Sequence, residues 1–255
     1  MTRPPIPSSP RWRRVLGSLA AAFLLWLLAI WPPPSWYRTN FPRETAFMAL
    51  RDRTAPDSTA WRPRYDPVPL ARMSSHLRHA VRLAEDRRFY EHWGVDFQAI
   101  REALGYRHEG FSWTSGADYG ELWRAARGAW SRRDQVRGAS TITQQLAKNL
   151  YLSPSRNPFR KLKEAVTAFR LEAALEKDRI LELYLNVVEL GPDLWGVEAA
   201  SRRYYDRPAE ALTPSQAAWL AATLPSPLAA NPKLRPGRIR WRQEIILQWM
   251  RREPY

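Results

Sequence analysis

Cysteine is absent from this chain of 255 residues. Its absence excludes disulfides, thiolate catalysis and zinc sites with cysteine ligands, and it is compatible with an oxidising compartment without proving one. Histidine is scarce, and the four residues do not form the H-E-x-x-H motif of zinc hydrolases: His76, His79, His92 and His108. The chain also lacks a P-loop and a G-x-S-x-G elbow, which argues against the hydrolases that depend on these motifs.

Lysine is rare, since it supplies only five of the 40 basic residues, while acidic residues number 25 and the net charge is +15. Such an excess predicts an anionic partner: nucleic acid, an anionic membrane surface or a phosphate-bearing substrate. Three of the five lysines lie in one short stretch, at Lys148, Lys161 and Lys163. Because lysine is a compact charge that suits phosphate oxygens, this grouping favours an anionic ligand there.

Residues 1–31 contain no acidic residue, and the run from Val15 to Trp31 contains no charge at all. Its 17 residues are at the short end of what spans a bilayer core of about 30 Å. The residues before it are rich in proline and arginine. We therefore predict a basic cytoplasmic tail over residues 1–14, a transmembrane helix over residues 15–31, and the remaining chain on the outer side, following the positive-inside rule.

A cleaved signal peptide is the alternative for this segment, because signal peptides also begin with basic residues. No small-x-small cleavage site follows the apolar run, so we favour an uncleaved anchor. Residues 32–70 contain proline, tryptophan and arginine in no clear period. We predict that they form an extended linker and entry strap leading into one domain over residues 71–255.

No stretch of this domain alternates apolar and polar residues over the length of a strand, whereas several repeat at helical spacing. The predicted fold class is therefore mainly α. Cap and stop residues place the helices as follows: one from Met73 to Glu85, one capped by Asp96 and ending near Gly105, one capped by Asp178 and stopped by Gly191, one over Gly196–Tyr205, one opened by a capping box at Thr213, and one over Gly237–Arg252. Between them, residues 105–133 carry tryptophans that suit either a membrane interface or a cover for the core.

The stretch from Arg137 to Glu164 is predicted to be two helices joined by a turn. Ser140 is the expected N-cap of the first helix, and Asn157 with Pro158 opens the second. Helical spacing aligns a polar stripe on the first helix and places one carboxylate among cations: Ser140, Thr141, Gln144, Gln145 and Lys148 form the stripe, and Glu164 lies among Lys148, Arg156, Arg160 and Lys163. The ordinary interpretation of such helices is a pair of solvated charged faces.

Glu85 is the second carboxylate of interest, because it stands at a helix end beside Asp86 in a segment dense with aromatics. An exposed helical glutamate is the ordinary interpretation. Two carboxylates, a cationic cluster and a membrane anchor nevertheless suit glycosyl transfer from a lipid diphosphate. A sugar hydroxyl needs a base to take its proton, and a departing diphosphate needs cations to neutralise its charge.

Five segments resemble, in order, the motifs of the peptidoglycan glycosyltransferases, family 51 of the glycosyltransferases. The first is EDRRFYEHWGVD, which matches E-D-x-x-F-x-x-H-x-G-x-D. The other matching segments are Gly138–Asn149, Arg160–Glu164, Lys177–Asn186 and Gly196–Tyr205. The resemblance covers about residues 70–230 and is closest to the monofunctional biosynthetic transglycosylases, since the S-x-x-K and K-T-G motifs of a transpeptidase are absent.

The resemblance implies a lysozyme-like helical domain with a membrane-facing jaw. It implies polymerisation of lipid II into β-1,4 glycan strands, with inversion and release of undecaprenyl diphosphate. Glu85 would be the base that deprotonates the acceptor hydroxyl, and Glu164 would assist at the second site. The residues that would contact diphosphate and sugar are Asp86, Ser140, Gln144, Lys148, Arg156, Arg160 and Lys163. The segment from Gly105 to Gln135 is longer than the family pattern leads us to expect.

No cofactor is required by the sequence, although some family members hold a divalent cation, Mg²⁺ or Mn²⁺, near the diphosphate. The partners implied are lipid II, the growing glycan strand, the membrane and other cell-wall synthesis proteins, with no nucleic acid. The implied location is the bacterial inner membrane, crossed once, with the N-terminus in the cytoplasm and the catalytic domain in the periplasm.

Two alternatives stay open at this point. A membrane-tethered scaffold would use the basic surface to hold an anionic polymer without turnover, and its binding would depend strongly on salt. A lytic enzyme would cleave glycan on a similar fold, but cleavage needs no cationic cradle for a diphosphate. The polymerase hypothesis requires Glu85 and the cationic cluster to share a single cleft.

Overall fold

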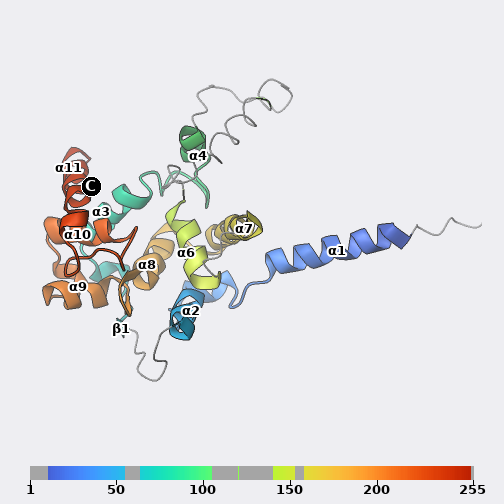
Figure 1. The fold of residues 1–255 in the computed structure, drawn as a ribbon, viewed down its shortest axis with the longest axis horizontal. Coiled ribbons are helices and arrows are strands. Elements are labelled where there is room, and N and C mark those ends of the chain that lie inside the picture. Colours follow the sequence, from blue (N-terminus) through green and yellow to red (C-terminus); the bar gives the residue numbers. More distant parts are fainter. Residues whose placement is uncertain (1–10, 55–63, 105–119, 121–139, 153–157, 254–255) are drawn as a thin grey trace, which may run out of the picture.

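The computed structural model describes residues 11–54, 64–104, 120, 140–152 and 158–253, and these residues are mainly helical (Figure 1). The mainly α class predicted from the sequence is confirmed. The helices are α1 (Arg11–Leu28), α2 (Ala46–Thr54), α3 (Ser75–Glu85), α4 (Phe97–Leu104), α6 (Ile142–Tyr151), α7 (Pro158–Ala174), α8 (Lys177–Val187), α9 (Val197–Tyr205), α10 (Pro214–Thr223) and α11 (Gly237–Arg252), with short 3-10 turns at Pro34–Arg38, Leu70–Arg72 and Ala209–Ala211.

Two groups of helices meet at α8. Helices α3, α9, α10 and α11 gather at one end of the body, while α2, α6 and α7 lie on the side nearer α1 (Figure 1). Residues on nearly every side of α8 are fully buried: Ile180, Leu181, Leu183, Tyr184 and Leu185. Burial on all sides explains why this segment is apolar all round, as predicted for a core helix.

The predicted boundaries of α8 are wrong at both ends. Its N-cap is Glu176 and not Asp178, which lies in the first turn. The helix ends at Val187, and Glu189–Gly191 then forms strand β2. Strand β2 pairs antiparallel with β3 (Leu194–Trp195), which pairs parallel with β1 (Arg64–Tyr65). These strands are too short for an alternating pattern to reveal them.

Glycine is required between strand β3 and helix α9. Gly196 has φ +80° and precedes the helix as its N-cap. A Cβ at this position would collide with the carbonyl oxygen of Asn186. The predicted helix over residues 196–205 is confirmed, as are the helix over Gly237–Arg252 and the capping box at Thr213.

The N-cap of α6 is Thr141, not the predicted Ser140. The Thr141 hydroxyl accepts the Gln144 N–H at 3.1 Å, and the Gln144 side-chain oxygen accepts the Thr141 N–H at 3.1 Å. This is a complete capping box, which satisfies two backbone donors. The Thr141 hydroxyl also donates to the Gly94 carbonyl at 2.6 Å, and thereby ties the start of α6 to the loop after α3.

Residues 32–54 and 64–70 are folded onto the helical body, unlike the extended linker that we predicted. Helix α2 packs against α6, and Arg51 makes two hydrogen bonds of 2.9 Å to Glu189. Tyr37 is buried edge-on against Tyr151, with ring centroids 6.0 Å apart. Because these apolar and ionic contacts join the segment to the helices, the segment is part of the folded domain.

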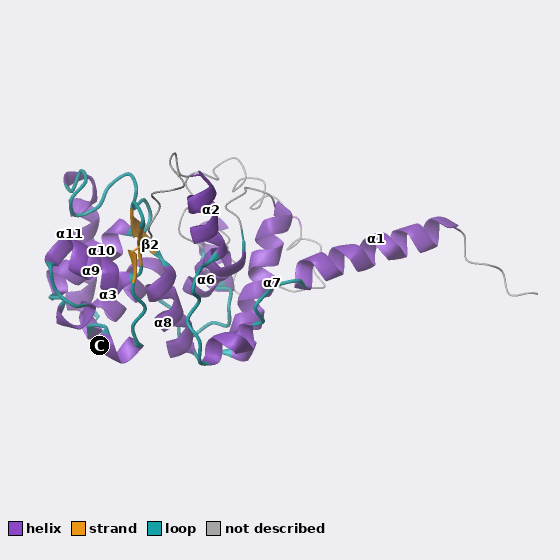
Figure 2. Cartoon of the chain, turned by 90° about the horizontal axis from the view of Figure 1, so that it is seen from below, coloured by secondary structure: helices purple, strands orange, loops and turns teal. Residues whose placement is uncertain are grey.

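Helix α1 projects from the body and touches it through its last turns, beside α7 (Figure 2). Lys163 donates to the Trp26 carbonyl at 2.6 Å, and Arg170 donates to the Leu28 carbonyl. These cations satisfy carbonyl groups that a helix leaves free at its C-terminus. Among the described residues, α1 included, no helix combines the length and apolar character that crossing a bilayer demands. The transmembrane helix over residues 15–31 stays a prediction.

The predicted long connection over residues 105–135 lies outside the described residues, apart from Gly120. The prediction of a jaw in that region is therefore not tested. The lysozyme-like arrangement also stays a prediction.

Candidate active site

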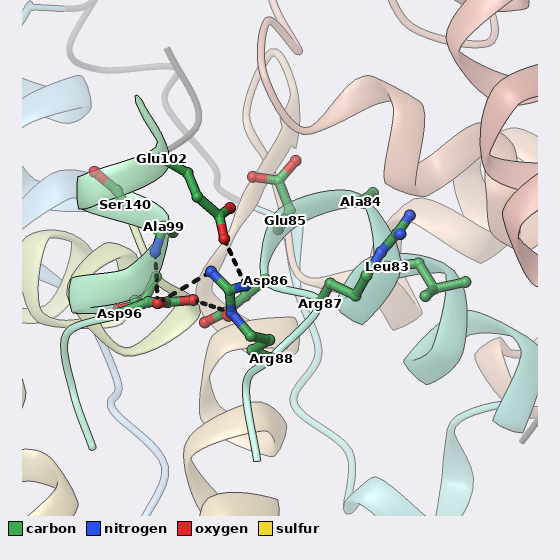
Figure 3. A pocket seen from close by; sticks show the side chains of 11 residues that line it. Leu83, Ala84, Glu85, Asp86, Arg87, Arg88, Asp96, Ala99, Glu102 and Ser140 are labelled. Atoms are coloured by element: carbon green, nitrogen blue, oxygen red, sulfur yellow. Dashed lines mark hydrogen bonds and ion pairs between the residues drawn. The ribbon is translucent and has the colours of Figure 1, made fainter. Parts of the chain in front are cut away.

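A pocket of about 360 Å³ lies where α3 ends, α4 begins and the chain enters α6 (Figure 3). Residues from three segments line it: Leu83 to Arg88 from the end of α3, Asp96, Ala99 and Glu102 around α4, and Ser140 and Thr141 before α6. Glu85 is therefore at the place where the two groups of helices meet. Figure 3 shows Glu85 and Asp86 leaving the end of α3 in different directions.

Glu85 is the last residue of α3, and its side chain is only 12% exposed. Its carboxylate receives one donor from each helix group. Gln145 Nε2 on α6 donates to Oε2 at 3.0 Å, and Arg242 Nη2 on α11 donates to Oε1 at 3.0 Å. Two donors from different helices fix the orientation of the carboxylate at the wall of the pocket.

Burial raises the pKa of the Glu85 carboxyl above its ordinary value. The bonds from Gln145 and Arg242 and the charge of Lys148 oppose that rise. Desolvation disfavours the charged form, while donors and cations stabilise it. The outcome is a carboxylate that holds a proton more tightly than an exposed glutamate does, which is what a general base requires.

The Gln145 amide is itself oriented by the buried Tyr184 of α8. The Tyr184 hydroxyl donates to Gln145 Oε1 at 3.0 Å, so Gln145 must turn its NH₂ group toward Glu85. Burial raises the pKa of Tyr184 well above its ordinary value, which keeps the hydroxyl protonated as a donor. Gln145 belongs to the predicted polar stripe, but the sequence analysis gave it no role at the site.

Asp86 is buried and connects the end of α3 to the start of α6. Its Oδ2 accepts the backbone N–H of Ile142 at 2.9 Å, at the start of α6, and lies 2.9 Å from His92 Nε2. A carboxylate at a helix N-terminus is also favoured by the helix dipole. These bonds join the end of α3 to the start of α6, and so set the distance between Glu85 and Gln145.

Glu164 on α7 lies between two cations. Arg160 Nη1 donates to Oε2 at 2.7 Å, and the Lys161 ammonium bonds to Oε1. The Lys161 ammonium also donates to the Ser140 hydroxyl at 2.9 Å. Because Ser140 lines the same pocket as Glu85, this contact joins the cationic cluster to that pocket. Lys161 was not among the predicted contacts, although its i, i+3 spacing from Glu164 could have identified it.

Lys148 lies one helical turn after Gln145 on α6, and hence on the same side of that helix. Burial lowers the pKa of its ammonium, and the charges of Lys161 and Arg160 lower it further, while those of Glu164 and Glu85 raise it. Lys148 is thus within electrostatic reach of both carboxylates. Its ammonium forms no hydrogen bond or ion pair within the described part of the chain. A half-buried cation of this kind is available to an anionic ligand.

The other predicted contacts are placed differently. Gln144 is buried in the capping box of α6. Lys163 is directed to α1, with its ammonium also 4.8 Å from the centre of the Trp26 ring. Arg156 lies outside the described residues.

The structure also brings together Asp86, His92 and Asp96, with possible ligand atoms within 4.8 Å of one another. These groups do not fit a divalent cation, because their oxygens are already engaged. Asp86 holds the Ile142 N–H, and Asp96 accepts from Arg88 Nε at 2.9 Å and from the Ala99 N–H at 2.8 Å. The two carboxylates of the cluster are thus accounted for by their contacts to the protein, whereas His92 Nδ1 is buried and forms no hydrogen bond within the described residues.

A second pocket of about 370 Å³ lies beyond Gln145 and Lys148, which both line it. Helix α2 supplies Phe47 and Arg51, and the segment Leu224–Ala229 closes another side. This pocket was not predicted, because the segment predicted over residues 32–70 was not expected to pack beside α6. Gln145 lines this second pocket together with Lys148 and also bonds to Glu85, which lines the first pocket.

Comparison with known proteins agrees with this geometry. The family model described as Transglycosylase matches residues 57–117 and 106–251. The chain belongs to the transglycosylase family. It is 41% identical over 247 residues to the biosynthetic peptidoglycan transglycosylase of Azoarcus sp. (strain BH72), covering 90% of this chain and 96% of the relative. The protein of the same name from Bordetella pertussis is 40% identical, covering 88% of each chain, and that from Acinetobacter baumannii is 36% identical, covering 93% and 94%.

Membership of this family confirms the resemblance inferred from the five sequence segments. The matched residues include Glu85, Lys148 and Glu164, which the fold gathers around α6. Ser140 lines the Glu85 pocket and accepts a hydrogen bond from Lys161, whereas the cations Lys148, Arg160 and Lys161 are not among the residues that line this pocket. That Glu85 and the cationic cluster share one cleft stays a prediction.

Proposed function

We propose that this transglycosylase polymerises lipid II into β-1,4-linked glycan strands in cell-wall biosynthesis, releasing undecaprenyl diphosphate with inversion. Relatives of about this length that are named biosynthetic peptidoglycan transglycosylases support the proposal. One observation carries it: a largely buried carboxylate of raised pKa, Glu85, lines a pocket and accepts a hydrogen bond from Gln145 of α6, and Lys148 stands one turn further along α6.

In the proposed step, Glu85 takes the proton of the acceptor 4-hydroxyl while that oxygen bonds to the anomeric carbon of the donor. The bond from the anomeric carbon to the diphosphate oxygen breaks, and the diphosphate leaves with the electron pair. Lys148 and the cations around Glu164 neutralise the negative charge that develops on it. As proposed, these side chains suffice without a cofactor.

Glu164 serves in this account as an anchor for cations. Both of its oxygens are engaged by Arg160 and Lys161, and the latter also reaches Ser140 at the pocket. A buried carboxylate that holds two cations keeps them near the site without releasing a proton itself. Ser140 can then offer its hydroxyl oxygen or its proton to a sugar or phosphate group.

The proposed location is the bacterial inner membrane, crossed once near the N-terminus, with the catalytic domain in the periplasm. The charge-free run from Val15 to Trp31 after three nearby arginines supports this topology. Large apolar side chains are exposed along α1 and at the start of α7, where Phe159 and Leu162 lie. Exposed apolar surface of this extent suits contact with lipid.

The test is turnover of labelled lipid II by the detergent-solubilised full chain. Glu85→Gln should reduce polymerisation at least about a hundredfold, because a general base contributes about 10² to 10⁴. Glu102→Gln is the matched control, since it removes a carboxylate from the same pocket that pairs with Arg88 and does not touch Glu85. The control should retain activity.

Three other outcomes would argue against this mechanism or this function. Polymerisation by Glu85→Gln at the normal rate would remove Glu85 from the mechanism. Shortening of preformed glycan would favour the lytic alternative. Salt-dependent binding of lipid II without product would favour the scaffold.

A further inference from the structure

The last helix of the chain supplies a guanidinium to the proposed base. Arg242 Nη2 lies 3.0 Å from Glu85 Oε1 and 3.2 Å from the Ala84 carbonyl oxygen, across 157 residues of sequence. It therefore bonds both one carbonyl group in the last turn of α3 and the carboxylate that ends this helix. Cations are favoured at a helix C-terminus, so the backbone of α3 also stabilises the position of Arg242.

Packing of α11 against the core fixes the side of the helix from which Arg242 projects. Ile239 and Ile246 lie three and four residues from Arg242 and are buried against the core. Helical spacing puts these three side chains on one side of the helix. Packing of the two isoleucines thus limits where the guanidinium can lie, and the 27% exposure of its side chain keeps it partly shielded from water.

Other contacts already hold α11 in place. Gln243 Nε2 donates to the Ser215 hydroxyl of α10 at 2.9 Å. Arg87 lies 5.0 Å from the Trp249 ring centre and 3.1 Å from Glu253. Docking of α11 therefore does not depend on Arg242 alone. A role at the Glu85 carboxylate would explain why Arg242 lies beside it.

The charged and titratable groups facing Glu85 come from several elements. Lys148 approaches from α6 and Tyr184 from α8, but neither bonds to the carboxylate. Arg88 lies across the pocket and pairs with Asp96 and Glu102. Within the described residues, Arg242 supplies the cation that touches Glu85 directly.

We propose that Arg242 is a positioning residue for the proposed polymerisation: it holds the Glu85 carboxylate ionised and directed into the pocket, ready to accept the proton of the acceptor hydroxyl. The proposal rests on the proposed function of Glu85. Arg242 opposes the effect of burial on the pKa of Glu85. Without the guanidinium, Glu85 would hold its proton up to a higher pH and would be protonated more often at the pH of the reaction.

The experiment compares Arg242→Met, Arg242→Lys and the control Arg240→Met, which removes an exposed cation from the same helix. Turnover of lipid II is measured with the full chain in detergent from about pH 5 to about pH 9, together with the melting temperature. A rise of one unit in the pKa of Glu85 reduces its ionised fraction about tenfold on the acid side. We therefore expect Arg242→Met to lose more activity than the unmodified chain on the acid side of its pH profile, by about tenfold for each unit by which the pKa of Glu85 rises, and to approach the unmodified chain at the alkaline end.

Arg242→Lys should recover most of the loss because it restores a cation, while Arg240→Met should follow the unmodified chain at every pH. A loss in Arg242→Met that is equal at all pH values, accompanied by a lower melting temperature, would show a merely structural role and overturn the proposal. Unchanged activity would overturn it as well. If Arg242→Met fails to fold, Arg242→Gln takes its place as the variant without the cation, and a pH profile and titration of Arg242→Gln identical to those of the unmodified chain overturn the proposal.

A second readout does not depend on turnover. A ¹³C NMR titration of the Glu85 carboxyl carbon, assigned by its disappearance in Glu85→Gln, reports the pKa directly. We expect a higher pKa in Arg242→Met than in Arg240→Met, and a smaller rise in Arg242→Lys. Equal values in all variants would overturn the positioning role. If the unmodified chain is inactive, the proposed function is refuted. The titration then still decides whether Arg242 lowers the pKa of Glu85.

Discussion

The two carboxylates of the site are held by opposite means. Glu85 receives one guanidinium and one neutral amide, at 3.0 Å each, and lines a pocket. Glu164 is enclosed by two cations and is not among the residues that line that pocket. The structure thus separates a carboxylate that can accept a proton from one that keeps cations in place.

This difference follows from where each residue stands in the fold. Glu85 ends α3 at the junction of the two helix groups, so its neighbours come from three other helices. Glu164 lies within α7, where Arg160 and Lys161 are its neighbours at spacings of four and three. Long-range packing defines the first environment, and local helical geometry defines the second.

Lys148 connects the two environments, and its removal should have the largest effect among the tests of this comparison. We expect Lys148→Met to reduce turnover of lipid II about a hundredfold, because it removes a half-buried cation that neutralises charge in the transition state. Lys233→Met, which removes a surface lysine, is the control. Normal turnover by Lys148→Met would show that the two environments act independently.

Glu164→Gln should have an intermediate effect on activity but the greater effect on stability. The substitution removes the negative charge that Arg160 and Lys161 both contact, so we expect turnover to fall about tenfold and the free energy of unfolding to fall by about 1–3 kcal/mol. Glu85→Gln should leave the melting temperature unchanged or higher. Because burial raises the pKa of Glu85, its ionised form destabilises the folded chain at neutral pH, and glutamine removes that charge.

Thermal unfolding of Glu164→Gln and Glu85→Gln at pH values near neutrality measures which substitution destabilises the folded chain more. A larger loss of stability in Glu85→Gln than in Glu164→Gln would reverse the comparison.

Lys163→Met should have the smallest effect on chemistry. Lys163 bonds to the end of α1 and forms no bond to Glu164, so turnover in detergent should stay within about twofold of normal, which corresponds to about 0.4 kcal/mol. Proteolysis near the junction of α1 and α7 should become faster. A strong loss of turnover with intact α1 would place Lys163 at the substrate instead.

These cases show what the sequence could predict. The motif around Glu85 and the R-K-x-x-E segment around Glu164 were recognisable, and family membership bears out that recognition. The caps at Thr213 and Asp96 were correct because capping is local chemistry. Lys163 was placed with Glu164 on one polar side of the helix by its spacing, but in the structure its ammonium bonds to the Trp26 carbonyl of α1.

Contacts between distant segments could not be predicted. Arg242 belongs to a helix that reads as basic and amphipathic, and nothing in its local pattern marks the one arginine that reaches Glu85. The fold of residues 32–54 onto α6 and β2 was equally hidden, since Arg51 meets Glu189 across 138 residues. Such pairings arise from tertiary packing, which periodicity does not report.

The pH dependence of a single turnover of lipid II, measured in the unmodified chain and in Glu85→Gln, tests the central claim most directly. A base must be ionised, so activity should fall as the pH drops through the raised pKa of Glu85. We predict half-maximal activity on the acid side above about pH 4.3, the ordinary pKa of glutamate, and no such acid limb in the residual activity of Glu85→Gln. An acid limb at or below the ordinary value, or the same acid limb in both proteins, would contradict the assignment of Glu85 as the base.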